Sequence, residues 1–263
     1  MNAAKRREGI ISMLKSTSFV KMSDIASHFN VSNETARRDL DYLQHQNIVR
    51  RIYGGAVLAE RTVSQGPVSR LSRFTSELNS IGMAAADMVK TGDAVFIGPG
   101  STTLQVARHL RDRKDITVVT NSFAVANELY NTDVTTYILG GLLSKDEQDI
   151  RGDLANSYVS NFYFDKVFLG CGGITMDYGV MDFSTTHSPI HGHVVKRSGK
   201  CILVASSKKF GTPAFVSACS LDDIHTIVTD NQLSEEYCMF LQERNIQLVL
   251  VEPSMEYSLD PDE

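Results

Sequence analysis

Hydrophobic residues recur every three or four positions along the first 45 residues, and this spacing predicts three short helices. The residues expected to share an apolar helical face are, in chain order, Ile10, Ile11, Leu14, Ile25, Ala26, Phe29, Ala36, Leu40 and Leu43. The first helix is expected over residues 5–16, and a tight turn at Val31-Ser32 is expected to separate the other two. Ser23 is expected to lead into the second helix, and Ser32 to cap the third.

Residues 48–56 mix apolar and basic side chains and end in a pair of glycines. This composition predicts a short β-hairpin with Arg50 and Arg51 at its tip or edge. Three helices followed by such a hairpin form a winged helix-turn-helix. We therefore expect a small winged helix-turn-helix domain over residues 1–57.

A polar stretch at residues 58–72 is expected to be a linker, because it contains a Gly-Pro pair and has no periodicity. Beyond it, short apolar runs alternate with segments of helical period. Strands are expected over residues 94–97, 116–119, 134–139, 166–169, 202–205, 226–229 and 246–251, and helices over 73–90, 101–110, 123–130 and 234–244. This alternation predicts an α/β domain over 73–253 with a mostly parallel sheet, followed by a loose acidic tail at 254–263.

Composition and charge add a contrast between the two parts. The 263 residues are 42% hydrophobic and 22% charged, which is ordinary for a globular protein. No apolar run reaches the ~20 residues of a membrane helix, and no signal peptide is evident, so we expect a cytoplasmic protein whose four scattered cysteines are reduced. The net charge is −5. Residues 1–59 hold nine basic and five acidic side chains, a balance of +4 that leaves −9 for the remainder.

The polar face of the predicted third helix begins with amide and hydroxyl groups and continues with Arg37 and Arg38. Such a helix fits the DNA major groove, where its first side chains reach base edges and its guanidinium groups reach phosphates. The alternative is the solvated face of an ordinary three-helix domain. Basic residues at the start of the first helix oppose its dipole, and a phosphate backbone would favour them there. The candidate DNA contacts are Lys5, Arg6, Ser32, Asn33, Thr35, Arg37, Arg38, Arg50, Arg51 and Tyr53.

Small and hydroxyl-bearing residues follow several predicted strands, at the sheet edge where ligands of such folds bind. The candidates from these loops are Gly98, Gly100, Ser101, Thr102, Thr103, Thr120, Asn121, Ser122, Gly140, Gly141, Gly170 and Lys209. Glycine allows close approach of a ligand, and the start of the helix at Ser101 attracts an anion. The loop lacks the Lys-Ser/Thr of a P-loop, and ordinary helix caps are the alternative. Together these loops predict a pocket for a small, hydroxyl-rich, anionic molecule.

The first 57 residues resemble the DNA-binding head of the DeoR family of bacterial transcriptional repressors. The resemblance rests on Val31-Ser32, on the run from Thr35 to Leu40 with Leu43, and on Arg51-Ile52-Tyr53-Gly54-Gly55-Ala56. This chain departs from the family pattern in having Ala36 for isoleucine, Asn47 for glycine and Tyr53 for histidine.

The resemblance continues through the second domain. It rests there on the loops at 100–103 and 120–122, Gly140-Gly141, Gly152 with Ala155, and Lys209-Phe210-Gly211. It implies a sensor fold related to ribose-5-phosphate isomerase and the CoA transferases. It also implies a sugar phosphate or similar metabolite as the effector.

The family leads us to expect a glutamate-rich stretch before the pair Lys196-Arg197, but residues 184–193 hold three histidines there and no acidic residue. The interpretation is an altered effector pocket that includes Ser184, His187, His191 and Lys196. The alternatives are exposed histidines at the start of a helix, or a zinc site, for which no carboxylate or cysteine stands at a known spacing. We expect no metal and no cofactor.

The leading hypothesis is a repressor of a carbohydrate-metabolism operon that acts as a homodimer or homotetramer on double-stranded operator DNA. A sugar phosphate or related effector would change its operator affinity. The second hypothesis is an isomerase-like or CoA-transferase-like enzyme with an appended DNA-binding head. It would use Lys196 or Lys209, yet the acidic residues expected nearby are absent. An RNA-binding regulator is a third, and no aromatic stacking motif supports it.

Overall fold

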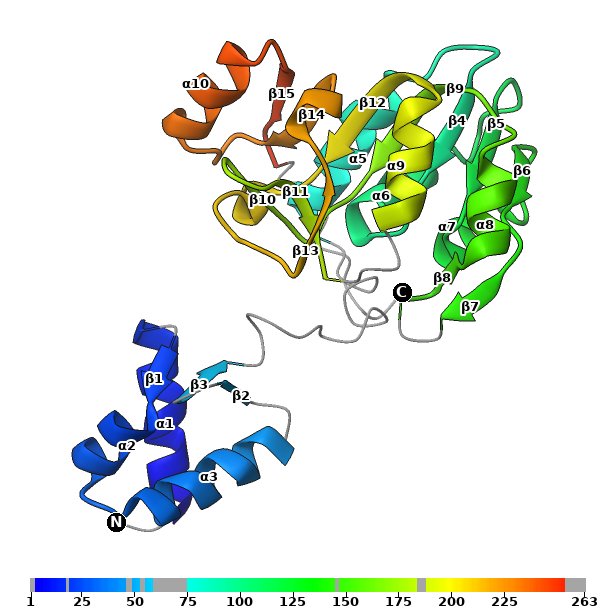
Figure 1. The fold of residues 1–263 in the computed structure, drawn as a ribbon. Coiled ribbons are helices and arrows are strands. Elements are labelled where there is room, and N and C mark those ends of the chain that lie inside the picture. The colour runs from blue at the N-terminus through cyan, green and yellow to red at the C-terminus, as the bar shows by residue number, and fades with distance from the viewer. Residues whose placement is uncertain are drawn as a thin grey trace, which may run out of the picture. The chain divides into compact units, whose positions relative to one another are not determined.

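The computed structural model describes residues 3–17, 19–45, 49–52, 55–58, 75–144, 147–183 and 188–253. The chain divides into two compact units, Met1–Gly66 and Pro67–Glu263 (Figure 1). Each unit is described separately below. The predicted linker from residue 59 onward and the predicted tail at 254–263 lie outside the described residues.

The first unit contains three helices and a small antiparallel sheet. The helices are α1 (Ala3–Thr17), α2 (Met22–Phe29) and α3 (Asn33–His45), and the strands are β1 (Phe19–Lys21), β2 (Val49–Ile52) and β3 (Gly55–Leu58). The strand order is β1-β3-β2, so the predicted hairpin β2–β3 gains a third strand that the sequence did not predict. The prediction of a small helix-turn-helix domain with a wing-like hairpin is confirmed.

The turn between α2 and α3 is fixed by local hydrogen bonds. Asn30 ends α2 in the left-handed conformation, and the Val31 N–H donates to the Ala26 carbonyl at 3.0 Å. The Ser32 hydroxyl accepts from the Thr35 N–H at 3.2 Å, which confirms Ser32 as the cap of α3. The prediction for Ser23 is wrong: α2 begins at Met22, so Ser23 lies in its first turn.

The apolar stripes predicted for the three helices meet in one core. Ile10, Leu14, Ile25, Leu40 and Leu43 are each at most 1% exposed. Their burial leaves the polar face of α3 on the surface.

A buried ion pair joins α1 to α3. Arg6 Nε lies 2.5 Å from one Asp39 carboxylate oxygen, and Arg7 Nε lies 2.8 Å from the other. The Asp39 side chain is 2% exposed and that of Arg6 10%. The Arg7 guanidinium also stacks on the Tyr42 ring, 3.6 Å from its centroid. Asp39 thus compensates two arginines beneath the exposed face of α3.

The second unit is built on seven parallel strands, as predicted. They are β4 (Ala94–Ile97), β5 (Thr117–Thr120), β6 (Thr135–Ile138), β9 (Phe164–Leu169), β12 (Ser198–Val204), β14 (Thr226–Asp230) and β15 (Gln247–Val251). Their order is β15-β14-β12-β9-β4-β5-β6, which places β4 beside β9 at the centre. Each predicted strand overlaps one of these seven, with its ends displaced by up to four residues.

Helices cover both faces of this sheet. One hydrophobic core lies under α5 (Ser76–Ala86), α6 (Ser101–His109) and α7 (Phe123–Leu129). A second core, on the other face, lies under α8 (Asp153–Val159), α9 (Ser188–Lys196) and α10 (Glu235–Glu243). Adjacent residues of β4 point to opposite cores, with Val95 and Ile97 in the first and Phe96 in the second. Among the described residues, no helix combines the length and apolarity that a membrane span requires.

Two smaller sheets were not predicted. One is the ribbon of β7 (Leu142–Ser144) and β8 (Asp149–Arg151). The other contains β10 (Gly173–Thr175), β11 (Gly179–Asp182) and β13 (Val216–Cys219) and is antiparallel. Both lie beyond the carboxyl ends of the main strands, where the loops between strands and helices begin.

Replacing Asp39 with asparagine should destabilise the first unit, because Arg6 would be left as a buried cation and Arg7 as a half-buried one, both without this counter-charge. We expect a loss of about 3 kcal/mol. Native-state hydrogen exchange of the α3 amides in the full chain should therefore accelerate about 100-fold. The matched control is Asp41→Asn, whose carboxylate is 43% exposed and 4.0 Å from Arg37; it should change exchange by less than about 3-fold. Equal effects of the two substitutions would contradict this role for Asp39.

Candidate functional site

Half of the ten predicted DNA contacts lie on α3 or at its cap. Asn33, Arg37 and Arg38 are exposed, and Ser32 begins the same face. The Arg37 and Arg38 side chains are 59% and 77% exposed. Their ion pairs with Asp41 and Glu34, at 4.0 and 3.4 Å, lie within the helix surface and are worth only a few tenths of a kcal/mol. Both guanidinium groups are therefore available to a phosphate.

The hydroxyl groups at the start of α3 hold each other in place. Ser32 Oγ lies 3.0 Å from Thr35 Oγ1, and it also accepts the Thr35 N–H. Thr35 is half-buried. The first turn of α3 thus presents a fixed set of polar groups beside the arginine pair.

Some of the other candidate DNA contacts are suitably placed, and others are not. Lys5 is exposed near the start of α1. Arg6 is not suited to a phosphate contact, because its guanidinium is buried against Asp39, and that expectation is corrected. Arg50 and Arg51 lie in β2, the edge strand of the small sheet. Tyr53 lies outside the described residues.

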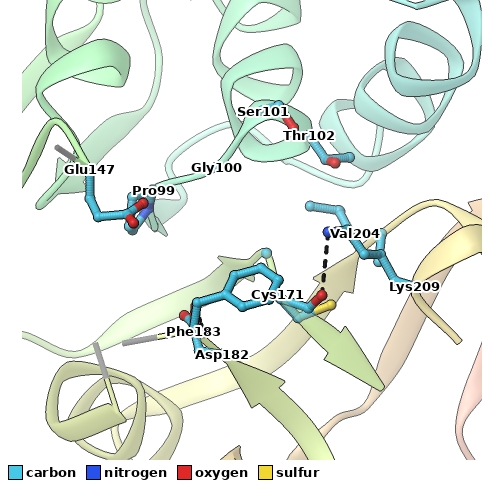
Figure 2. A pocket seen from close by; sticks show the side chains of 13 residues that line it. Pro99, Gly100, Ser101, Thr102, Glu147, Cys171, Asp182, Phe183, Val204 and Lys209 are labelled. Carbon is cyan, nitrogen blue, oxygen red and sulfur yellow. Dashed lines mark hydrogen bonds between the residues drawn. The ribbon is translucent and has the colours of Figure 1, made fainter. Parts of the chain in front are cut away.

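A cavity in the second unit lies at the carboxyl ends of the central strands. Its volume is about 90 Å³. It is lined by Pro99, Gly100, Ser101, Thr102, Glu147, Gly170, Cys171, Gly172, Asp182, Phe183, Val204, Ala205 and Lys209 (Figure 2). Gly100, Ser101, Thr102, Gly170 and Lys209 are therefore brought together, as the sequence predicted.

One wall of the cavity is the N-terminus of α6. Its N-cap residue is Gly100, at φ 148°, and no side chain caps the helix. By contrast, Thr75, Ser122 and Ser234 each cap their helices with a side-chain oxygen. The first N–H groups of a helix have no acceptor within it and carry its positive dipole end. This end of α6 is thus suited to an anion.

Lys209 lies across the cavity from α6. It ends the short 3₁₀ helix η2 (Ser207–Lys209), and its Nζ donates to the Gly172 carbonyl at 3.3 Å. The ammonium also lies 5.7 Å from the centroid of the Phe183 ring. In Figure 2 a dashed line marks this hydrogen bond at the end of the Lys209 side chain. Lys209 and the α6 N-terminus together give the cavity two sources of positive potential.

Carboxylates lie on other parts of the wall. Figure 2 shows Glu147 and Lys209 on opposite sides of the cavity, with Asp182 below. Asp182 also accepts the Phe183 N–H at 2.7 Å. Carboxylate oxygens accept hydrogen bonds from hydroxyl groups. The cavity thus offers both hydrogen-bond donors and acceptors, which a phosphorylated polyol would need.

The thiol in the wall is not a nucleophile. Burial raises the pKa of Cys171 to about 12, against the smaller opposing effect of the Lys209 ammonium. The neutral thiol therefore dominates at physiological pH, and a thiol is a far weaker nucleophile than a thiolate. Within the described part of the chain, no group of three or more His, Cys, Asp or Glu side chains is placed to hold a metal ion.

The loop after β5 does not reach the cavity, contrary to expectation. Thr120, Asn121 and Ser122 are at most 1% exposed. Thr120 Oγ1 donates to the Ile97 carbonyl at 2.6 Å and accepts the Ser122 N–H, while Ser122 caps α7. Asn121 Nδ2 donates to the Ile150 carbonyl. Both hydroxyl groups and the Asn121 amide nitrogen are thus used inside the fold, which supports the helix-cap alternative, while the buried Asn121 Oδ1 has no hydrogen-bond partner within the described residues.

Other predicted effector residues also lie elsewhere. Gly98 directly follows β4 and does not line the cavity, and Thr103 lies in α6 and is fully buried. Gly140 and Gly141 precede β7, and a Cβ at Gly141 would lie 2.6 Å from the Arg151 carbonyl oxygen. Close backbone packing therefore leaves no room for a side chain at Gly141, whereas a Cβ at Gly140 would have no atom within 4 Å. Ser184 and His187 lie outside the described residues.

The α9 residues are not at the cavity. His191 is 4% exposed and does not line it. Lys196 ends α9 just before β12, whereas the cavity adjoins Val204 and Ala205 at the other end of that strand. Seven residues of β12 separate the two by about 20 Å. Lys196 instead borders a surface hollow with Ser160, Tyr163, His193 and Arg197.

Sequence reasoning missed Glu147, Asp182 and Phe183. Glu147 comes from the ribbon β7–β8, and the other two come from the end of β11. The only sequence signal for these residues is a carboxylate near a predicted glycine loop. That signal does not identify the strand that brings the carboxylate to the cavity.

Comparison with known proteins covers both units. A family model described as DeoR-like helix-turn-helix domain matches residues 6–62, and one described as DeoR C terminal sensor domain matches residues 74–231. The glycerol-3-phosphate regulon repressor of Escherichia coli K12 is 30% identical over 251 residues, covering 95% of this chain and all of that protein. The HTH-type transcriptional repressor GlcR of Bacillus subtilis is 30% identical over 256 residues, covering 96% and 98%.

Among solved structures, a probable sor operon regulator from Shigella flexneri has a TM-score of 0.40 at 14% identity, covering 65% of this chain and 88% of that one. Ribose 5-phosphate isomerase A from Methanocaldococcus jannaschii has a TM-score of 0.39 at 14% identity, covering 51% and 54%. The curated relatives named above are repressors rather than enzymes. With one family model matching each unit, the chain belongs to the DeoR family of transcriptional regulators.

Proposed function

We propose that this chain represses a carbohydrate-metabolism operon and that a small phosphorylated metabolite controls its affinity for the operator. The first unit binds double-stranded DNA through α3, and the metabolite binds in the cavity of the second unit. The named relatives include a repressor of a glycerol-3-phosphate regulon, which fits a phosphorylated effector.

The observation that carries the effector proposal is the uncapped N-terminus of α6 facing Lys209. Such a helix end and an ammonium group attract a dianionic phosphate. Glu147 and Asp182 accept hydrogen bonds from the hydroxyl groups of the attached polyol. The same carboxylates disfavour a ligand with a second negative charge at its other end, so a sugar or polyol monophosphate fits best.

For DNA, the supporting feature is the exposed face of α3. Thr35 and Asn33 are the proposed base-edge contacts, and Arg37 and Arg38 the proposed phosphate contacts, with Lys5 and the edge of β2 extending the footprint. Two such units in one dimer would contact two half-sites about one helical turn apart.

A route from the effector cavity toward the first unit begins at η2. Lys208 adjoins Lys209, and its Nζ lies 3.0 and 3.1 Å from the two Glu77 carboxylate oxygens. Glu77 is in the first turn of α5, close to the segment that connects the two units in sequence. A ligand that draws Lys209 toward its phosphate would also move Lys208. We propose that this ion pair couples cavity occupancy to the position of α5.

Replacing Arg37 or Arg38 with alanine should weaken binding to the chain's own upstream region by about 1–3 kcal/mol and lower the slope of log K against log salt by about 1. Fluorescence anisotropy with a labelled promoter fragment, over 50–300 mM salt, measures both. Arg111→Ala, at an exposed arginine of the second unit, is the control and should bind like wild type. Salt-independent binding by the wild-type chain would refute the DNA-binding role assigned to α3.

Replacing Lys209 with methionine should abolish the effector response while leaving operator binding without ligand unchanged. A thermal-shift panel of glycerol 3-phosphate, hexose phosphates and the corresponding free polyols identifies the ligand, because one that binds only the folded state raises its melting temperature. The shift should appear with phosphorylated compounds and disappear in Lys209→Met. Lys200→Met is the control, since Lys200 also donates to one neutral oxygen, that of Gln247. A ligand that stabilises both variants equally binds at another site.

Replacing Glu77 with glutamine should weaken the coupling between the two sites and leave each site intact. The ratio of operator dissociation constants with and without ligand should move toward 1 by about 2- to 5-fold, because a half-exposed ion pair is worth up to about 1 kcal/mol. Anisotropy titrations at saturating ligand measure this ratio. Asp133→Asn, which breaks the exposed Lys114–Asp133 pair, serves as the control. An unchanged ratio in Glu77→Gln would exclude this route.

A further inference from the structure

The second unit exposes an unusual number of large apolar side chains at one end of its sheet. Fourteen such residues are exposed in the described part of this unit, and nine of them fall between residues 123 and 163. We call these nine the β6–α8 surface: Phe123, Tyr130, Tyr137, Ile138, Leu142, Leu143, Leu154, Tyr158 and Tyr163. A clustered apolar surface on a globular domain marks an interaction site more often than scattered exposed residues do.

Several of these residues lie on elements that contact one another. Tyr137 on β6 and Tyr158 on α8 both contact the Phe162 ring, with centroid distances of 6.1 and 5.3 Å. Leu154 lies one turn before Tyr158 on α8, so the two share a helical face. The ribbon β7–β8 contacts both α7 and α8. Figure 1 shows α7, α8, β6, β7 and β8 gathered at the end of the sheet opposite α10 and β15.

The strand at this edge is prepared for contact as well. β6 ends the strand order, and its ladder partner within the described residues is β5, on one side. Tyr137 and Ile138 are 46% and 43% exposed although they are neighbours that point to opposite faces. An open edge strand with apolar side chains promotes aggregation of a monomeric domain, but it can serve as a contact surface in a domain that forms an oligomer.

We propose that the β6–α8 surface is where a second copy of this chain binds. At about 200 Å² for a fully exposed large side chain, the exposed fractions of the nine residues amount to about 1,000 Å² on one copy. A stable complex buries about 800 Å² on each partner. The nine side chains carry no charge at neutral pH, so two copies of the surface meet without like-charge repulsion. A two-fold axis through such a surface brings the same residues together from both copies.

A second copy is also what the first unit requires. A helix-turn-helix reads two half-sites when it is presented twice, and the link between the copies sets their effective concentration on DNA. The surface lies on the second unit, and its β7 residues belong to the same ribbon whose turn carries Glu147 to the effector cavity.

Sedimentation velocity of the full chain tests the proposal. The wild-type chain at 1–100 μM should sediment as a dimer or larger assembly. Leu154→Glu and, separately, Leu142→Glu should reduce the mass of that assembly by at least half, since each places a charge inside the contact. Both positions are more than 70% exposed, so neither glutamate disturbs the core of the unit.

The matched control is Met239→Glu, which introduces the same charge at a 54% exposed position on α10, at the other end of the sheet. It should sediment like wild type. A monomeric wild-type chain at 100 μM would overturn the proposal and leave the surface to a different protein. Assemblies of wild-type mass in both Leu142→Glu and Leu154→Glu would overturn it as well.

Discussion

In the described part of the protein, no side chain caps the N-terminus of α6. Gly100 takes a backbone conformation that favours glycine and has no side chain to accept the first N–H groups. A serine or threonine at this position would be strained by the positive φ, and its Cβ would lie 3.1 Å from Thr103 Oγ1, whereas Ser122 caps α7 from an ordinary extended conformation. The effector proposal depends on this uncapped end, because it leaves a positive helix end opposite Lys209 in a cavity bounded by carboxylates.

The parallel sheet makes this arrangement possible. Because all seven strands run in one direction, the loops after β4, β9 and β12 emerge at one edge and meet there, although they are 34 or more residues apart in sequence. The antiparallel strands β10, β11 and β13 close the cavity from outside and deliver Asp182 and Phe183.

In the first unit, Asp39 has a comparable organising role. It neutralises two arginines under α3, so that the arginines on the outer face of that helix remain in water.

The sequence predicts the main elements well, since each rests on a local pattern. Apolar runs of four to six residues locate the seven parallel strands, and the stripe of Ala36, Leu40 and Leu43 orients α3. The sequence is a poor guide to the position of a side chain whose contacts come from residues far away in the chain. From the sequence, Arg6 is expected at the surface, but in the structure it is buried in an ion pair with Asp39, 33 residues away. Thr120 to Ser122 look like a ligand loop, yet their hydroxyl groups bond to the backbone of the same turn and of β4. Lys196 belongs to a family motif, but only the direction of α9 tells that it ends far from the cavity. The strands that supply Glu147 and Asp182 are three or four residues long, too short for any periodicity.

Amide chemical shifts test the central claim most directly. The backbone ¹H–¹⁵N resonances of Ser101, Thr102 and Thr103 can be followed while the full chain is titrated with a sugar phosphate that raises its melting temperature. The account predicts large downfield shifts of these three amide protons that saturate with the ligand and are absent with the unphosphorylated sugar. Shifts that leave these amides unchanged and appear only around other loops would contradict it.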